Sequence, residues 1–404
     1  MRELGITARL MPTTTGVPMV VGELRSPRAT RTLLFYNHYD VQPAEPLDGW
    51  DTPPFEPTVR DGCVFARGAT DNKGNIVSRL AAVQAFLRTN GSVPINLKFL
   101  VEGQEEIMSP GLPTFVESHA DLLAADGCVW EDTMGRIDAP VVSLGSKGMC
   151  QLELRCKVAN SESHSAYAGL YQNAIWRLTW ALASLKAVGD RVLVDGFLDD
   201  LRPLTSAEQQ MVQQLPILDH ARLQTSALQS LRPGLHPGEA HARQSLDPTF
   251  NISGIRGGYQ GEGTKTIIPA EASAHLDIRL VPDQDPARTA DLVRAHLTSR
   301  GFDDVEVLYL GGSHPSRSPV DSTLNRAIAA ASETAYGQPP VFEPHQAGST
   351  PQWVIQRYLD IPCSATGVGY VGCLSHAPNE NIRIDHLLTG AKYMAAIMHE
   401  FAHR

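Results

Sequence analysis

The first third of the chain alternates between apolar runs and stretches with helical spacing of apolar residues. Residues 32–41, 95–101 and 127–133 are typical of buried strands, and carboxylates follow the second and lie near the end of the third. Residues 76–87 and 112–123 have the periodicity of helices. This alternation predicts an α/β fold, a three-layer α/β/α sandwich in which ligands gather at the carboxyl ends of the strands.

The pattern changes at Gly148. Strands are expected near 149–158, 250–255, 272–280 and 305–310, helices over 174–185 and 286–300, and a looser polar segment over 198–242. Strands and helices that segregate in this way predict an inserted α+β domain over residues 148–314. Helices over 322–336 and from about 387 to the end then return the chain to the first domain, which comprises 1–147 and 315–404.

Composition narrows the classes of function. The 404 residues are 42% hydrophobic and 19% charged, and they carry a net charge of −10, which argues against a nucleic-acid or anionic-membrane partner. We therefore expect a small-molecule or peptide substrate. The six cysteines are scattered without a C-x-x-C pair, and no stretch has the length of a membrane span. A cytoplasmic protein with reduced thiols is the simplest interpretation.

Candidate chemistry begins with Glu105 and Glu106, which follow the strand 95–101. Adjacent carboxylates repel one another unless a cation or proton lies between them, although a solvated turn is the plain alternative. His38 and Asp40 lie on one side of a strand end, as a metal-binding imidazole with an orienting carboxylate would, or as a hydrogen-bonded histidine. Asp71 precedes a helix, where it is either a metal ligand or an N-cap.

One histidine and several carboxylates at strand ends form a set of nitrogen and oxygen ligands. Such a set suits zinc, manganese or cobalt better than a metal that prefers thiolates. Its members are His38, Asp71, Glu105, Glu106 and Asp132, with His376 as a late addition.

Five separated motifs carry a family resemblance. They are 37–41 (NHYDV), 67–74 (RGATDNKG), 102–106 (EGQEE), 130–133 (WEDT) and 375–380 (SHAPNE). Together, and in order, they resemble the di-zinc exopeptidases and amidohydrolases, a family of carnosinase-type dipeptidases, aminoacylases, glutamate carboxypeptidases, acetylornithine deacetylases and succinyl-diaminopimelate desuccinylases. The match covers nearly the whole chain, and the dipeptidase branch fits best.

The resemblance implies a role for each matching residue. Asp71 would bridge two zinc ions, with Mn²⁺ or Co²⁺ as possible substitutes, and Asp40 would orient the first histidine. Glu105 would be the general base that moves a proton from the attacking water to the leaving amine. The remaining ligands divide between the two ions: His38 and Asp132 at one, Glu106 and His376 at the other.

The inserted domain resembles the lid and dimerisation domain of the same family. His164 would act in trans, entering the active site of the partner subunit in a homodimer, although a surface histidine in a polar loop is the alternative. Arg279 would bind the free carboxylate of the substrate through its planar donor fork, with Thr266 and Ser349 as further substrate-binding residues. An arginine on the solvated face of a strand is the alternative for Arg279.

Some features depart from the family pattern. The chain lacks most of the N-terminal helical segment of its relatives, so we expect either a truncated start or an edge that is covered differently. Gln104 and Met108 stand where relatives often have Glu and Gly. Glu131 precedes Asp132, and we favour Asp132 as the ligand.

The C-terminus also contains an H-E-x-x-H motif, His399 to His403, with Glu400 as the potential base. Only Arg404 follows, so a third ligand downstream is missing, and a solvated helix end explains the motif. The sequence therefore predicts a di-zinc dipeptidase. An N-acyl-amino-acid amidohydrolase, deacetylase or glutamate-type carboxypeptidase is the alternative enzyme, and a non-catalytic metal- or peptide-binding relative is the alternative class.

Overall fold

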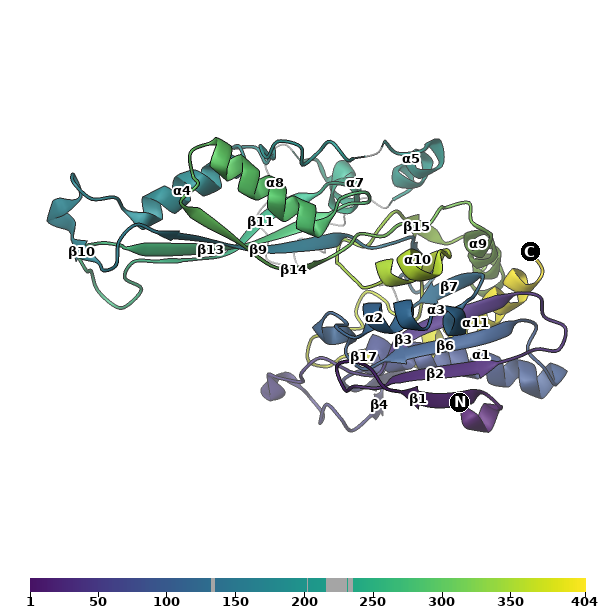
Figure 1. The fold of residues 1–404 in the computed structure, drawn as a ribbon. Coiled ribbons are helices and arrows are strands. Elements are labelled where there is room, and N and C mark those ends of the chain that lie inside the picture. The colour runs from purple at the N-terminus through teal and green to yellow at the C-terminus, as the bar shows by residue number, and fades with distance from the viewer. Residues whose placement is uncertain (132–134, 202, 216–230, 232–234) are drawn as a thin grey trace.

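The larger sheet of the computed structural model has eight strands in the order β1-β2-β6-β3-β7-β16-β8-β15 (Figure 1). The structure describes residues 1–131, 135–201, 203–215, 231 and 235–404. Strand β3 pairs in parallel with both β6 and β7, so its residues are buried on both faces. The strands are β1 (Thr7–Met11), β2 (Met19–Leu24), β3 (Thr32–His38), β6 (Asn96–Glu102), β7 (Gly127–Trp130), β8 (Val141–Ser143), β15 (Val341–Glu343) and β16 (Cys363–Ala365).

Helices cover both faces of this sheet (Figure 1). Helices α1 (Asn75–Asn90), α9 (Thr323–Tyr336) and α11 (Ile384–Ala402) enclose one apolar core with the sheet. On the other face, α2 (Leu112–Ser118), α3 (Ala120–Leu123) and α10 (Trp353–Leu359) enclose a second core. The predicted three-layer α/β/α sandwich is therefore confirmed. Among the described helices, none combines the length and apolar character that a membrane span requires.

A second, antiparallel sheet has the order β11-β13-β9-β14. Its strands are β9 (Gly148–Lys157), β11 (Thr249–Gly257), β13 (Glu271–Leu280) and β14 (Val305–Ser313). Helices α4 (Ala174–Leu185) and α8 (Pro286–Ser299) share an apolar core with one face of it. Because these strands and helices all lie between residues 148 and 313, we propose the predicted inserted domain, 148–314, as one folding unit.

Smaller elements complete the fold. Strands β10 (Ser163–His164) and β12 (Ile267–Ile268) pair at the end of the second layer that lies farthest from α10 (Figure 1). Strands β4 (Thr58–Arg60), β5 (Cys63–Phe65) and β17 (Asn381–Arg383) form a three-stranded sheet. This sheet joins the segment before Asp71 to the segment after His376.

Three predicted elements differ from the structure. The helix expected over 112–123 is broken at His119, whose ring contacts the Phe115 carbonyl at 2.8 Å and whose ψ of 27° leaves the helical range. The strand expected over 32–41 ends at His38. The polar segment 198–242 contains helix α5 (Ser206–Gln213) and the start of α7 (Pro237–Leu246). A capping box, in which Thr205 and Glu208 bond reciprocally, begins α5.

Candidate active site

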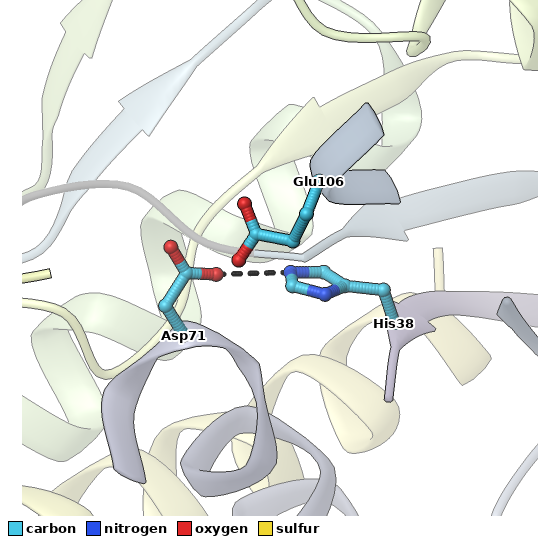
Figure 2. A group of neighbouring side chains, drawn as sticks. All are labelled: His38, Asp71 and Glu106. Carbon is cyan, nitrogen blue, oxygen red and sulfur yellow. Dashed lines mark hydrogen bonds and ion pairs between the residues drawn. The ribbon is translucent and has the colours of Figure 1, made fainter. Parts of the chain in front are cut away.

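Two histidines from distant parts of the chain meet at one aspartate. His38 ends β3, and its Nε2 lies 2.9 Å from Asp71 Oδ1. The other oxygen, Asp71 Oδ2, lies 3.0 Å from Nε2 of His376. Figure 2 shows the first of these contacts, with Glu106 directed toward the same point. The aspartate thus faces one imidazole with each oxygen, as a bridging ligand would.

The helical turn Glu105–Ile107 contributes two carboxylates to the cluster. Glu106 Oε2 lies 3.3 Å from His376 Nε2, and it also accepts a hydrogen bond of 2.8 Å from the Gln42 amide. The Glu106 backbone N–H donates to Asp40, whose other oxygen lies 3.3 Å from His38 Nδ1. Asp40 therefore fixes the ring of His38 and the loop of Glu106 together.

Glu131 joins this cluster at the end of β7. Its Oε2 lies 3.5 Å from His38 Nε2, and potential ligand atoms of His38, Glu105 and Glu131 all lie within 4.8 Å of one another. The ligand predicted next to it, Asp132, lies outside the described residues. Glu131 therefore lies at the site, and Asp132 remains the predicted metal ligand of the two neighbouring carboxylates.

The charges of this cluster shift the pKa of both histidines. Burial alone would lower the pKa of His38, but hydrogen bonds with Asp40 and Asp71 and nearby carboxylates raise it to about 12. Hydrogen bonds with Asp71 and Glu106 raise the pKa of His376 to about 10. Burial would raise the pKa of Asp71, yet its two histidine partners hold it well below the ordinary value.

The pKa values of two nearby glutamates are raised, whereas that of Asp71 is lowered. Burial, together with the charges of Asp71 and Glu106, raises the pKa of Glu105 to about 7. Burial also raises the pKa of Glu102 to about 7, although Tyr36 and Ser109 donate hydrogen bonds to it. A carboxyl group with a pKa near neutrality exchanges protons readily at pH 7.

Buried carboxylate oxygens without a hydrogen-bond partner indicate whether the cluster fits a metal ion. Among the described residues, Glu106 Oε1 and Glu131 Oε2 are buried and have no hydrogen-bond partner. Buried oxygens of this kind are costly unless a cation or proton neutralises them. The donor set of imidazole nitrogens and carboxylate oxygens is one that zinc, manganese or cobalt accepts, so the residues present fit such ions.

Glu380 secures the loop that carries Asp71. Its buried carboxylate accepts hydrogen bonds from three backbone N–H groups, those of Gly68, Thr70 and Asp71, at 2.9–3.0 Å. The guanidinium of Arg67, which is 4% exposed, donates a fourth bond of 2.9 Å. The sequence motif 375–380 contains Glu380, but sequence reasoning gave it no role because its four donors lie more than 300 residues away.

We expect Glu380→Ala to reduce the free energy of unfolding by about 3–5 kcal/mol, because it leaves the buried Arg67 charge without its partner. Urea denaturation of the metal-free protein measures this. The exposed Glu333 on α9 supplies the control, since Glu333→Ala should change stability by less than about 0.5 kcal/mol. Equal stability of the two variants would contradict the structural role of Glu380.

A cavity of about 410 Å³ opens beside the cluster. Its lining includes Asp71, Glu105, Glu106 and His376, together with Ser349. Arg279 Nη1 donates a hydrogen bond of 2.8 Å to Ser349 Oγ, and a half-buried Asp277 lies 3.4 Å from its Nε. The predicted pair is therefore in contact: Ser349 lines this cavity, and Arg279 bonds to Ser349.

His164 and Thr266 are among the predicted residues that do not line this cavity. His164 and Thr266 are exposed on neighbouring segments, where His164 pairs with Ile267 and Ser165 N–H donates to the Thr266 carbonyl. The Ala166 N–H donates to His164 Nδ1 at 3.0 Å, so this bond engages Nδ1 and not Nε2.

The C-terminal H-E-x-x-H residues lie apart from this site. The rings of His399 and His403 are 4.4 Å apart, and Glu400 pairs with Arg404. In the described part of the chain, the groups of three or more potential ligands all include His38 and none includes these residues.

Sequence reasoning missed several residues that support the site. Gln42 and Arg67 contact it through long-range pairs that no local motif reveals, and Glu102 shares the E-G-x-E-E motif but was assigned no role. The signal in the sequence is the pair of Glu102, a carboxylate at the end of an apolar strand, and Gly103 after it. A Cβ on Gly103 would lie 2.2 Å from the Tyr39 ring, so only glycine fits there.

The chain is similar in sequence to known peptidases. Residues 34–400 match the model of peptidase family M20/M25/M40. The chain is 30% identical to human Beta-Ala-His dipeptidase over 95% of this chain and 78% of that protein. It is 28% identical to the Cys-Gly metallodipeptidase dug1 of Schizosaccharomyces pombe, over 95% and 83% respectively.

A solved structure shares the fold across the whole chain. The M20 family metallo-carboxypeptidase Sso-CP2 from Sulfolobus solfataricus superposes with a TM-score of 0.90 at 35% identity, covering 100% of this chain and 92% of that one. The predicted family resemblance is thereby confirmed. This chain belongs to peptidase family M20/M25/M40, a family of metal-dependent hydrolases.

Proposed function

We propose that this protein is a di-zinc dipeptidase that hydrolyses the amide bond of a small substrate with a free carboxylate. The observation that carries the proposal is the convergence of His38, Asp71, Glu106 and His376 near Glu105, beside one cavity. Mn²⁺ or Co²⁺ would be possible substitutes for zinc. The relatives named as dipeptidases support the choice of reaction.

The proposed ligands divide between two ions. Asp71 is shared, because its two oxygens face different histidines. His38 serves the first ion together with Asp132, and Glu106 and His376 serve the second. Asp40 orients His38 from its Nδ1 side. Two such ions would lower the pKa of the attacking water and stabilise negative charge on the scissile carbonyl oxygen.

Glu105 is the proposed general base. It lies within reach of the cluster, and burial raises its pKa to about 7, close to the pH at which it must both accept and return a proton. It takes the proton from the attacking water and delivers it to the leaving amine. Both transfers pass through the same carboxylate, so its side chain needs no large movement.

Arg279, Thr266 and Ser349 are proposed to bind the substrate. The guanidinium of Arg279 already bonds to Ser349, which lines the cavity, and its planar set of N–H donors suits a carboxylate. A cavity of about 410 Å³ accommodates a substrate of dipeptide size. Such an arrangement selects substrates whose carboxylate lies next to the scissile amide.

We further propose a homodimer in which His164 acts in trans. Support comes from exposed aromatic side chains near β10, which exceed what a solvated surface normally carries. Tyr167, Tyr171, Trp176 and Trp180 are each more than half exposed, and the two tryptophan rings stack 5.8 Å apart. A second copy of this chain would cover them and deliver His164 to the partner's cavity.

The location is proposed as cytoplasmic. All six cysteines lie among the described residues as free thiols, which suits a reducing compartment. The proposed partners are limited to a second copy of the chain and a small peptide or N-acyl amino acid, with no nucleic acid or membrane.

A carboxypeptidase acting on longer chains is the second candidate. The solved relative with 35% identity is named a metallo-carboxypeptidase, and both activities need a site for the free carboxylate. An N-acyl-amino-acid amidohydrolase or deacetylase shares the same proposed chemistry. These candidates differ in what the site accepts on the amino side of the scissile bond.

A substrate panel separates the candidates. Dipeptides, their N-acetylated forms, tripeptides and N-acyl amino acids, including acyl-glutamates, are incubated with zinc- or manganese-loaded protein, and the released amino acids are measured. Cleavage of free dipeptides alone is the expected result. Comparable cleavage of blocked or longer peptides would replace the dipeptidase by a carboxypeptidase, and acyl amino acids alone would indicate an amidohydrolase. No cleavage with two ions bound would indicate a binding protein.

Metal uptake should release protons. The raised pKa values of His38 and His376 keep both imidazoles charged at pH 7 in the metal-free protein, whereas a metal ligand must be neutral. Calorimetric titration with zinc in two buffers of different ionisation enthalpy should therefore show release of about two protons. His376→Ala should reduce the number by about one, and metal binding without proton release would contradict the assignment.

The same pKa shifts set the pH dependence of the metal-free protein. Both histidines have folded-state pKa values above the ordinary value of 6.5. Their contribution to stability is therefore complete below about pH 6.5 and is lost as the pH rises through the folded values. Thermal unfolding measured between pH 6 and 10 should show a decline that zinc abolishes.

A further inference from the structure

The buried face of helix α1 is polar where it approaches the candidate metal centre. Five buried residues follow helical spacing: Asn75, Ser78, Arg79, Ala82 and Val83. The last two pack in the apolar core, whereas the first three lie at the end of the helix near Asp71. Arg79 is 1% exposed, and arginine is rarely buried to this extent unless its charged group has partners.

The guanidinium of Arg79 bridges two strands at the point where they part. Among the described residues, backbone pairing of β3 with β7 ends at Phe35 opposite Val129. Beyond it, Arg79 Nη1 donates to the Tyr36 carbonyl, and Nη2 donates to the carbonyls of Trp130 and Glu131 at 2.8 and 3.0 Å. The arginine thus replaces the missing sheet bonds at the strand ends.

Packing restricts the guanidinium to this position. Its central carbon lies 5.2 Å from the centre of the Phe35 ring. The rings of Tyr36 and Trp130, whose carbonyls accept its bonds, stack with centroids 3.5 Å apart. The two strand ends are therefore fixed relative to each other by a ring stack and by Arg79.

A second branch of the network reaches the Asp71 loop. Arg79 Nη1 also donates to the Asn37 side-chain oxygen, and the Asn37 amide donates to the side-chain oxygen of Asn72. Both asparagines are at most 1% exposed. Asn37 precedes His38, and Asn72 follows Asp71, so each asparagine adjoins a proposed ligand.

We propose that Arg79 is a positioning residue that sets the relative placement of three ligand-bearing segments before metal binds. The first two segments carry the proposed ligands His38 and Asp71, and the third leads through Glu131 to the proposed ligand Asp132. The proposal rests on the metal site of the proposed function, and it assigns no contact between Arg79 and substrate or metal. Its consequence is that metal affinity depends on a side chain from the interior of α1.

The test compares Arg79→Lys with Arg88→Lys, a matched control on the exposed face of the same helix. Lysine keeps the charge but has a single ammonium group that cannot span both strands and Asn37. Zinc affinity is measured by competition with a chelating dye, and the cobalt absorption spectrum reports ligand geometry. We expect zinc affinity to fall about 10–100-fold in Arg79→Lys and to stay unchanged in Arg88→Lys.

Thermal unfolding of the metal-free proteins separates positioning from folding. A variant that unfolds near the wild-type temperature but binds zinc weakly and has an altered cobalt spectrum supports the proposal. Wild-type zinc affinity in folded Arg79→Lys would overturn it. If Arg79→Lys does not fold, Asn37→Ala carries the test, because it cuts only the branch to Asn72. Unchanged zinc affinity in that variant would equally overturn the proposal.

The wild-type titration keeps the two proposals distinct. If the wild-type protein does not bind two ions, the proposed function fails. If it binds two ions and the Arg79 variant binds them equally well, only the positioning role fails.

Discussion

Glu105→Gln should reduce turnover by about 10²–10⁴-fold, the range that general acid–base catalysis contributes. Glutamine has nearly the same shape, but its amide cannot accept the proton of the attacking water. The pKa of Glu105, raised to about 7 by burial and neighbouring carboxylates, suits a group that must also return the proton. The measurement is kcat for the best dipeptide from the substrate panel.

Metal analysis makes this test specific to the base. Glu105→Gln should retain two ions per subunit, whereas Glu106→Gln should lose zinc affinity, because the Glu106 carboxylate contacts His376. The exposed Glu117 on α2 provides a neutral control, Glu117→Gln. Near-normal turnover in fully metallated Glu105→Gln would remove Glu105 from the mechanism and direct attention to Glu131.

His164→Ala should reduce turnover by about 10²–10³-fold while leaving metal content unchanged. The residue is exposed on β10 and does not line the cavity of its own chain, so we expect its catalytic effect to come through the proposed second subunit. Loss of a donor to the developing negative charge on a carbonyl oxygen typically costs about 10²–10³-fold in kcat. The measurement is steady-state kinetics on a zinc-loaded dimer whose mass is verified in solution.

Mixed dimers then distinguish a shared site from a structural effect. Subunits carrying His164→Ala and Glu105→Gln are nearly inactive alone, but a mixed dimer has one site with both residues intact. After complete subunit exchange, about a quarter of wild-type activity is expected, since half the dimers are mixed and each has one complete site. Mixed dimers that remain inactive would contradict action in trans.

Much of the site could be predicted because its residues occupy strand ends. His38 ends β3, and the E-G-Q-E-E turn follows β6, so the parallel arrangement brings them to one edge. His376 was predicted through family resemblance, and the structure places it against Asp71. Local pattern and sheet direction together therefore explain why His38 lies near the turn that contains Glu105 and Glu106, but they do not place His376.

The supporting residues could not be predicted in the same way. Arg79 lies at a position of α1 that helical spacing assigns to the buried face. A charged residue at such a position breaks the expected pattern of apolar residues. Only the separation of β3 from β7 explains it, and that is a tertiary feature. Helix α5 was missed because a capping box and two buried residues, Glu208 and Met211, stabilise it rather than a long apolar stripe.

The contact between His376 and Asp71 joins residues 305 positions apart. During translation at roughly 5–20 residues per second, about 15–60 s separate the synthesis of Asp71 from that of His376. Strand β16, which pairs with β7, is also made late, so the central sheet stays incomplete for most of that time. A ribosome-bound chain therefore exposes sheet edges and isolated carboxylates together, and the proposed metal site can be completed only after His376 has been made.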